Sequence, residues 1–501
     1  QQEQIVRYLT SSHNPRLIAV EEVPNSMVAN PPFYERLNTS TYRYIATYYD
    51  SGRNNKRQVA VGDEVELIFE AYEFTGSAPS LNTLYYTNNA DMIEKLAENG
   101  LNSEFWSLEP LKVKIGSGDI IKGVEASLVD CREGDVVEVY SKSGEFLGCG
   151  HYQIGSITVR ILSFDECEIN QDFWYNRLMA AYKARESLGL TTSSNTNCYR
   201  LVHGEGDFLP GLIIDIYNKT AVLQAHSAGM FLAKREIADA LQKVYGGALE
   251  AIYDKSQATA PFKAGLDLKD GYIWGGANAA QMVGANGAEV VIENSNKFYV
   301  NWIEGQKTGF FLDQRDNREL VGKYAKGKSV LNLFCYTGGF SIYALNAGAK
   351  SVDSVDSSKK AMELVDQNVV LNGFNPQQQH HSYCEDAIEF MRNAPANKYD
   401  LIVVDPPAFA KHRGALDNAL RAYKRLNALA IEKVKAGGLV FCYSCSQVVD
   451  KQAFALAIFS AAAQTGRKVR ILHRLTQPAD HPVSIYHPEG EYLKGLVLLV
   501  E

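Results

Sequence analysis

Residues 329–341 read SVLNLFCYTGGFS, and this stretch decides the fold of the C-terminal part of the chain. Its apolar first half predicts a buried strand. A loop with two adjacent glycines follows, and the next residues, FSIYALNAG, predict a helix. Glycine lets a backbone come close to a ligand, and a strand that passes through such a loop into a helix is typical of ligand-binding α/β folds.

The alternation of strand and helix continues to the end of the chain. YDLIVVD (399–405) and LVFCYS (439–444) read as continuous apolar strands, and the segments between such strands show helical periodicity. Fully apolar strands alternating with helices indicate a parallel sheet that is covered on both faces. The last two strands, in RKVRILHRL and YLKGLVLLV, are joined by a loop without helical periodicity and predict an antiparallel edge. We therefore predict a Rossmann-like α/β domain over residues 301–501.

Four features fall at the carboxyl ends of the predicted strands, where open α/β sheets bind ligands. They are the loop 334–340 after the first strand, Asp356 after the second, Asp386 after the third and Asp405-Pro406-Pro407 after the fourth. Each acid alone is equally consistent with a solvated turn residue, and the loop lacks the G-x-G-x-x-G of dinucleotide binders. Their order at successive strand ends predicts one ligand-binding crevice.

The rest of the chain divides into three parts that differ in composition and in hydrophobic periodicity. Residues 166–300 combine two helical patterns with strands and glycine turns, which predicts an α+β domain. Residues 134–165 read as short strands joined by glycine turns. Residues 1–133 contain short β-like runs that are rich in Tyr, Asn and Ser.

Charge and cysteine content limit the function classes. The net charge is −8, but residues 1–140 hold 12 Lys+Arg and 21 Asp+Glu, a net of −9, so the remainder carries +1. A neutral remainder leaves room for the local basic patches that nucleic-acid binding needs. Eight cysteines at irregular spacing in 501 residues fit reduced thiols in a cytoplasm. No apolar run is long enough to span a bilayer, and the first residues lack a signal-peptide core, so we expect a cytoplasmic protein without a membrane partner.

Cys445 lies in FCYSCSQ (441–447), where a strand gives way to a loop. Such a thiol is an inert buried residue, half of a redox or zinc pair with Cys442, or a nucleophile. No second C-x-x-C pair supports a metal site, and we expect none. As a nucleophile, Cys445 has Ser444 and Ser446 beside it, whose hydroxyls are expected to lower its pKa.

Together these segments resemble class I S-adenosylmethionine-dependent methyltransferases. More narrowly, four motifs resemble the family of large-subunit ribosomal RNA cytosine-5 methyltransferases: KTGFFLDQRDNR (307–318), VLNLFCYTGGFS (330–341), VVDPPAFAK (403–411) and YSCSQ (443–447). The resemblance covers residues 134–501 and implies a PUA domain, a central α+β domain and a methyltransferase domain.

The resemblance implies a set of site residues. S-adenosylmethionine is the expected cofactor, with Phe334, Tyr336, Thr337 and Gly338 at its methionine part, Asp356 at its ribose, Asp386 near its adenine, and Gln314 and Arg315 closing over it. Cys445 is the expected nucleophile toward C6 of a cytosine, and Asp405 is expected to hold the polar edge of the pyrimidine. Phe409, Lys411, His412, Arg413, Tyr423 and Arg425 are candidate RNA contacts, although residues 411–413 read equally well as a solvated loop.

The N-terminal part resembles other families. Residues 1–140, above all LKVKIGSGDIIKGVEASLVDCREGDVVEVY, resemble an FKBP-like domain of exported bacterial lipoproteins. The pattern breaks off after Tyr140, which predicts little prolyl isomerase activity. Residues 134–165 resemble the second half of a PUA domain, a small RNA-binding β-barrel, and the expected first half is replaced by the FKBP-like stretch.

These observations leave rival functions open. The leading interpretation is methylation at C5 of a single-stranded or flipped-out cytosine in ribosomal RNA, with a homodimer as an open assembly state. A second is methylation of an exocyclic base nitrogen, because DPPAF is close to the Asp/Asn-Pro-Pro-aromatic motif of such enzymes. A third is a non-catalytic binding protein that uses the FKBP-like module. Cys445 discriminates the first two, because nitrogen methylation needs no thiol.

Overall fold

The computed structural model describes residues 133–141, 144–153, 157–261, 266–275, 289–410 and 412–501, and the backbone of short strands nearer the N-terminus. The chain packs into two compact units. One consists of Gln1–Ile169, Ala225–Lys234 and Gln257–Lys269, and the other of Asn170–Gln224, Arg235–Ser256 and Asp270–Glu501. The second unit therefore combines most of the predicted central domain with the predicted methyltransferase domain.

The first unit begins with two small sheets. One has the strand order β2-β3-β1-β5-β6 and the other pairs β4 with β7. The strands are β1 (Gln4–Arg7), β2 (Glu35–Arg36), β3 (Thr41–Tyr44), β4 (Glu64–Leu67), β5 (Glu70–Glu73), β6 (Leu84–Thr87) and β7 (Leu111–Lys114). The FKBP-like resemblance lies mostly outside the described residues and stays a prediction.

An antiparallel sheet follows in the same unit. It consists of β8 (Val136–Tyr140), β9 (Phe146–Tyr152) and β10 (Val159–Ser163), in the order β10-β9-β8. A Cβ atom on Gly150 would lie 2.1 Å from the carbonyl oxygen of Arg160, so this pairing requires glycine. The short helix α5 (Ala228–Leu232) packs on β9, where a Cβ on Gly229 would meet the ring of His151 at 2.1 Å.

The second unit contains a five-stranded sheet with the order β11-β12-β13-β14-β15. Its elements are α4 (Gln171–Ser187), β11 (Cys198–His203), η5 (Gly204–Asp207), β12 (Leu212–Tyr217), β13 (Thr220–Ala225), α6 (Lys234–Val244), β14 (Ala251–Asp254) and β15 (Gly271–Trp274). A hairpin of β16 (Glu289–Glu293) and β17 (Asn296–Val300) follows. Its two turn residues, Asn294 and Ser295, have φ of 47° and 66°, as hairpins with two-residue turns require.

The same unit ends in a seven-stranded sheet with the order β20-β19-β18-β21-β22-β24-β23. The strands are β18 (Ser329–Leu333), β19 (Ser351–Asp356), β20 (His380–Cys384), β21 (Leu401–Val404), β22 (Gly438–Ser444), β23 (Val469–Leu475) and β24 (Lys494–Val500). The first five in this order pair in parallel, and β24 pairs antiparallel with both β22 and β23. The predicted Rossmann-like sheet with an antiparallel edge is therefore confirmed.

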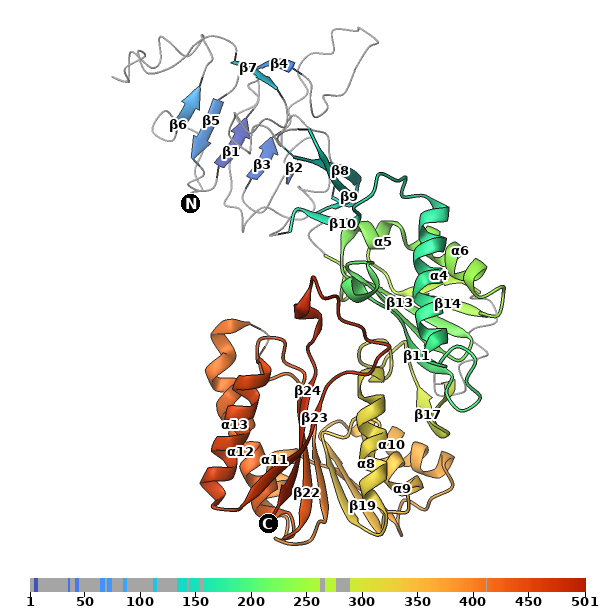
Figure 1. The fold of residues 1–501 in the computed structure, drawn as a ribbon, viewed down its shortest axis with the longest axis vertical. Helices are drawn as coiled ribbons and strands as arrows, with labels where there is room; N and C mark the ends of the chain where they lie inside the picture. The colour runs from blue at the N-terminus through green and yellow to red at the C-terminus, as the bar shows by residue number, and fades with distance from the viewer. Residues whose placement is uncertain are drawn as a thin grey trace. The chain divides into compact units, whose positions relative to one another are not determined.

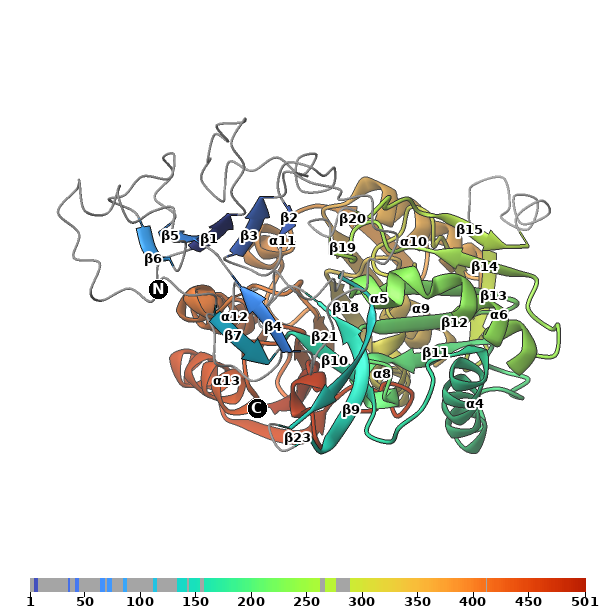
Figure 2. The ribbon, with the colours of Figure 1, turned by 90° about the horizontal axis from the view of Figure 1, so that it is seen from above.

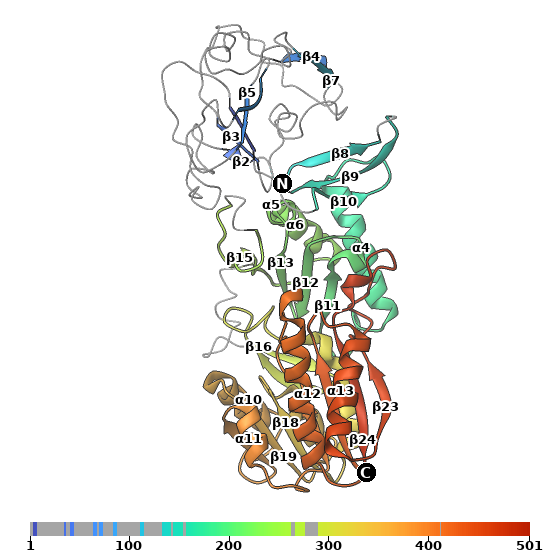
Figure 3. The ribbon, with the colours of Figure 1, turned by 90° about the vertical axis from the view of Figure 1, so that its left-hand side faces the viewer.

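Helices cover both faces of this sheet: α8 (Arg315–Ala325), α9 (Gly339–Asn346), α10 (Lys359–Leu371), α11 (Ala387–Asn393), α12 (Leu416–Lys433) and α13 (Lys451–Thr465). Successive strand residues alternate between two cores, so that Val403 packs with the α8–α10 side and Val404 with the α11–α13 side. Figures 1 and 2 show α12 and α13 opposite α9 and α10 across the sheet, and Figure 3 shows α12 beside α13. No helix in the described part of the chain combines the length and apolarity of a membrane span.

Candidate active site at the carboxyl ends of the central strands

A cavity of about 290 Å³ opens at the carboxyl ends of β18, β19, β21 and β22. Its wall is formed by residues within 306–314, by Arg318, by the loop after β18 with the start of α9, by residues 356–358 and 405–407, and by Cys445 and Leu493. The predicted site residues in its wall are Gln314, Phe334, Tyr336, Thr337, Asp356, Asp405 and Cys445. Three of the four predicted strand-end features thus lie in one cavity wall, and Asp386, the feature after β20, does not.

The loop after β18 is held in an unusual backbone conformation. Phe334 and Tyr336 have φ of 57° and 48°, in the left-handed region that non-glycine residues seldom adopt. Gly338 has φ of 81° and caps α9. The hydroxyl of Tyr336 accepts a hydrogen bond from the backbone N–H of Gln306 at 3.0 Å, which ties this loop to the segment before α8. Such strain is concentrated at functional sites, where the surrounding structure enforces it.

Asp356 and Thr337 offer polar groups to the cavity. The Asp356 carboxylate accepts hydrogen bonds from the backbone N–H groups of Tyr336 and Ser358, at 3.0 and 2.9 Å, one on each oxygen. Each oxygen keeps a lone pair for a second donor. The Thr337 hydroxyl is buried and has no hydrogen-bond partner among the residues that the structure describes. A buried orphan hydroxyl beside a carboxylate fits a polar ligand such as the amino-acid and ribose parts of S-adenosylmethionine.

Asp405 lines the cavity. Gln314 donates from Nε2 to its Oδ2 at 2.9 Å, and Asn317 orients Gln314 by donating to its Oε1 at 2.6 Å. Burial, with the nearby Asp313 carboxylate, raises the pKa of Asp405 to about 7. Asp405 is therefore partly neutral near pH 7, so it is able both to donate and to accept a hydrogen bond.

Cys445 follows the last residue of β22 and is partly exposed in the cavity wall. Burial, followed by the charge of Asp405, raises the pKa of its thiol to about 11. The prediction that the hydroxyls of the flanking serines lower this pKa is wrong. The Ser444 hydroxyl donates to the Tyr423 hydroxyl at 2.9 Å, and the Ser446 hydroxyl accepts from the backbone N–H of Ala410 at 3.2 Å. Both hydroxyls are engaged away from the thiol.

Cys442 is distinct from Cys445. It is fully buried among the α11–α13 side of the core, and its thiol donates to the carbonyl of Leu496 at 3.4 Å. Burial raises the pKa of this thiol to about 12. Within the described residues no group of three or more His, Cys, Asp and Glu side chains is arranged to hold a metal ion.

Sequence reasoning missed three charged residues of the cavity wall, Lys307, Asp313 and Arg318. The Lys307 ammonium lies 2.7 Å from Asp313 Oδ2 and 4.4 Å from the centre of the Phe311 ring. The Tyr492 hydroxyl donates to the same carboxylate oxygen at 2.6 Å. Burial opposes the charge of Asp313, but Lys307 and its other partners hold the pKa of this carboxyl well below its usual range. All three belong to the motif KTGFFLDQRDNR (307–318), and this position was the signal from which they could have been predicted.

Three predicted cofactor residues do not line the cavity. Gly338, with its positive φ, is the N-cap residue of α9. Asp386 is exposed and caps α11 by accepting hydrogen bonds from Ile388 and Glu389. Arg315 binds Asp480 with two hydrogen bonds, at 2.7 and 3.0 Å, so its guanidinium is engaged elsewhere. Among the candidate RNA contacts, Tyr423 is fully buried and not available for base stacking.

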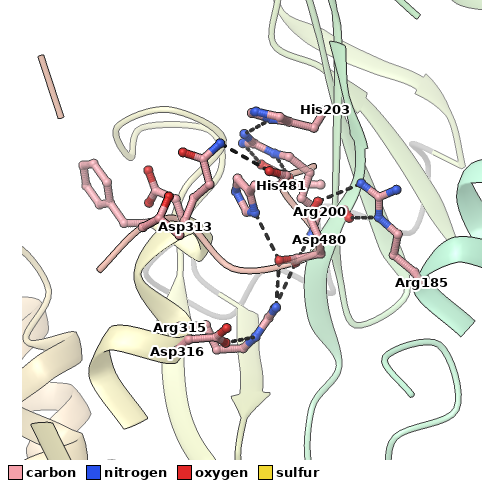
Figure 4. Close-up of polar contacts among 12 residues, drawn as sticks. Arg185, Arg200, His203, Asp313, Arg315, Asp316, Asp480 and His481 are labelled. Atoms are coloured by element: carbon pink, nitrogen blue, oxygen red, sulfur yellow. Dashed lines mark hydrogen bonds and ion pairs between the residues drawn. The ribbon is translucent and has the colours of Figure 1, made fainter. Parts of the chain in front are cut away.

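A buried polar network anchors the segment that carries Lys307, Asp313 and Gln314. Asp480 accepts from Arg315 and from the backbone N–H of Arg200, and its backbone carbonyl accepts from Arg185 (Figure 4). Arg200 also forms a two-fold ion pair with Asp215, at 2.8 Å for each contact. Thr308 donates to Asp215 at 2.6 Å, so β12 of the five-stranded sheet holds the start of this cavity wall.

The sheet, the strained loop and the strand-end acids define a class of protein, the Rossmann-like S-adenosylmethionine-dependent methyltransferases. A family model described as S-adenosylmethionine-dependent methyltransferase matches residues 200–490, and the chain belongs to this family. S-adenosylmethionine is thus its cofactor. A PUA-like domain model matches residues 115–164, so the PUA-like part starts before residue 134, inside the stretch assigned to the FKBP-like pattern.

Curated relatives of this chain share one name within the methyltransferase family. A protein of Aeromonas hydrophila subsp. hydrophila named ribosomal RNA large subunit methyltransferase I is 39% identical over 383 residues, which are 75% of this chain and 93% of the relative. One of the same name from Tolumonas auensis is 39% identical over 371 residues, covering 73% and 90%.

Two solved structures with similar folds are also methyltransferases by their descriptions. A structure from Streptococcus mutans, described as a candidate SAM-dependent methyltransferase, has a TM-score of 0.62 and 25% identity, and covers 74% of this chain and 92% of that one. Another, a candidate methyltransferase complexed with SAH, has a TM-score of 0.63, covers 75% and 94%, and at 24% identity shares the fold.

Proposed function

We propose that the chain forms 5-methylcytosine in large-subunit ribosomal RNA through a covalent bond between Cys445 and C6 of the target cytosine. One observation carries the proposal: Cys445 and Asp405 line the same cavity as the strained loop and Asp356. The names of the curated relatives support the RNA substrate, and the PUA-like match supports RNA docking. A stacked base does not reach such a cavity, so the target cytosine must be unpaired or flipped out.

The cofactor and the base would occupy different parts of the cavity wall. S-adenosylmethionine, when bound, supplies an electrophilic methyl group. Asp356 would accept hydrogen bonds from its ribose hydroxyls, and the Thr337 hydroxyl would find its missing partner in the methionine part. Gln314 would not contact the cofactor directly but would orient Asp405, because its Nε2 donates to Asp405 Oδ2 at 2.9 Å.

Asp405 suits the polar edge of cytosine. That edge presents an acceptor at N3 next to the donor at N4. A neutral carboxyl donates to N3 while accepting from N4, whereas an ionised carboxylate repels the N3 lone pair. The raised pKa of Asp405 keeps the neutral form available near pH 7. Binding N3 to a proton donor also draws electrons from C6 and prepares it for attack.

Cys445 supplies the nucleophile that C5 of cytosine lacks. Its thiol loses a proton to solvent, and the thiolate forms a bond to C6, which makes C5 electron-rich. C5 would then take the methyl group, and the electron pair of the broken carbon–sulfur bond would stay on the sulfur of the methyl donor. A base removes the C5 proton, the electron pair restores the C5–C6 double bond, and the thiolate leaves. One difficult substitution is thus divided into addition and elimination.

The proposal is tested by mass spectrometry of RNA nucleosides after incubation with the protein and isotope-labelled cofactor. We expect label in 5-methylcytosine. With 5-fluorocytosine at the target, removal of the C5 substituent is blocked, and the protein should form a covalent adduct with RNA. Label on an exocyclic nitrogen would favour the rival chemistry.

Variants of the two thiols near the end of β22 make a matched pair. Cys445→Ala should still bind the cofactor, lose nearly all turnover and give no adduct. Cys442→Ala should keep the adduct, because Cys442 is buried in the core with its thiol bound to Leu496. Wild-type turnover in Cys445→Ala would rule out the covalent mechanism.

A further inference from the structure

Lys494 is a buried cation behind the segment that carries Cys445. It begins β24 and pairs in register with Ser444, the residue before Cys445. Only 5% of Lys494 is exposed. Its ammonium donates to the carbonyl oxygens of Ser446 and Val449, at 2.6 and 2.5 Å, and these two residues lie just after the thiol in the chain.

The hydrogen bonds of this ammonium go to backbone carbonyl oxygens, whereas a buried lysine usually has a carboxylate as its counter-ion. Among the residues that the structure describes, no carboxylate forms an ion pair with Lys494. The nearby acids are engaged elsewhere: Asp450 caps α13, and Glu491 binds Lys451 and Thr476. Burial lowers the pKa of Lys494 to about 8. A buried charge that is bound only by carbonyls is costly, and an anion that forms during the reaction would compensate for it.

We propose that Lys494 is a positioning residue whose buried ammonium holds the Cys445 segment and stabilises the thiolate of Cys445. The inference rests on the proposed function, which makes that thiolate the nucleophile. Deprotonation places one negative charge on Sγ, and the proton goes to solvent.

The charges of Cys445 and Lys494 act on each other, since the thiolate is among the groups that raise the pKa of Lys494. Asp405 and Asp313 face Cys445 and oppose the thiolate. Lys307 favours the thiolate, but its ammonium is paired with Asp313 at 2.7 Å. On the side of Lys494, Lys451 is the one cation among the charges that influence it, and it is paired with Glu491.

The test is the alkylation rate of Cys445 by iodoacetamide between pH 7 and 10, followed by mass spectrometry of the peptide that contains it. Neither RNA nor cofactor is present, so the result is independent of the methylation product. In Lys494→Met we expect alkylation at pH 7, where most of the wild-type Lys494 is charged, to slow by about tenfold or more, because a pKa raised by one unit removes about nine-tenths of the thiolate. Lys494→Arg should recover part of the rate.

Controls separate charge from structure. Lys451→Met removes a nearby cation whose side chain is 60% exposed, and it should leave the alkylation profile unchanged. Lys494→Gln keeps one donor for the Ser446 carbonyl, and it decides the question if the methionine variant does not fold. A folded Lys494→Gln or Lys494→Met protein with the wild-type profile would overturn the proposal.

Discussion

Asp405 and Asp313 show how neighbouring carboxyl groups of one cavity differ in proton affinity. Asp313 has Lys307 and Tyr492 as partners and stays ionised, and its charge helps to raise the pKa of Asp405. Such pairs of titratable groups with separated pKa values are typical of active sites. In the proposed reaction the pair provides a neutral donor for cytosine N3 beside a fixed negative charge.

Asp405 should make stability depend on pH. Its folded pKa of about 7 lies above the ordinary value of 3.8. Because the folded state retains the proton longer, the stabilisation is complete below pH 4 and is lost as pH rises to 7. The free energy of unfolding should fall by up to roughly 1.4 kcal/mol per pH unit in this window relative to Asp405→Asn. Urea unfolding of both proteins from pH 4.5 to 7.5 measures the difference, and parallel curves would contradict the raised pKa.

Asp356 should contribute to cofactor affinity. Asp356→Ala removes the carboxylate that orients Tyr336 and Ser358 and the proposed acceptor of the ribose hydroxyls. We expect a loss of about 1.5–3 kcal/mol in the binding free energy of S-adenosylmethionine, as for hydrogen bonds to charged groups. Calorimetry measures it, and unchanged affinity would exclude this placement. Asp386→Ala tests the adenine contact: an unchanged affinity assigns Asp386 to capping α11 alone.

At the scale of elements, the β16–β17 hairpin is joined to α8 by a buried ion pair. Arg318 binds Glu293 through two hydrogen bonds of 2.8 Å, and the two side chains are 3% and 0% exposed. Tyr343 of α9 donates to the same carboxylate at 2.9 Å. Arg318 also lines the cavity, so this pair connects the hairpin to the site.

Breaking this pair should be strongly destabilising. Glu293→Gln leaves a buried guanidinium without a counter-ion, and we expect the free energy of unfolding to fall by about 3–5 kcal/mol. Glu304→Gln is the matched control, because the Lys360–Glu304 pair is 65% and 56% exposed and should contribute less than about 1 kcal/mol. Urea unfolding measures both. Equal effects would show that burial does not set the strength of these pairs.

At the scale of the whole molecule, every residue of the cavity wall belongs to the second compact unit. The five-stranded sheet contributes through Asp215 and Thr308, which hold the segment before α8. The predicted boundary near residue 300 lies within this unit, between its five-stranded and its seven-stranded sheet. The PUA-like match lies at residues 115–164, outside that unit.

Removal of residues 1–114 should leave methylation intact. The shortened chain keeps the PUA-like match and the complete cavity wall. We expect unchanged S-adenosylmethionine affinity by calorimetry and unchanged labelling of RNA. Loss of labelling with intact cofactor binding would show that the first residues help to hold RNA.

The full chain should show little prolyl isomerase activity in a peptide assay, and robust activity would overturn that expectation.

Much of the methyltransferase sheet was predictable, because strands and helices are indicated by residue types and hydrophobic periodicity over short stretches of sequence. The apolar run of β21 and the glycine loop after β18 identify themselves by residue type. Parallel strands then bring Asp356, Asp405 and Cys445 to one edge by geometry alone. The sequence by itself thus determined the fold class and the core of the candidate site.

Only the tertiary structure decided how polar groups are paired across long separations. Arg315 meets Asp480 across 165 residues, Ser444 is bound by Tyr423, and Lys494 reaches the carbonyl of Ser446 across 48 residues. None of these partners follows from residue type or spacing, because many polar groups compete for each one until packing selects it. For the same reason the pKa values of Asp405 and Cys445 follow from burial and neighbouring charges, which exist only in the folded chain.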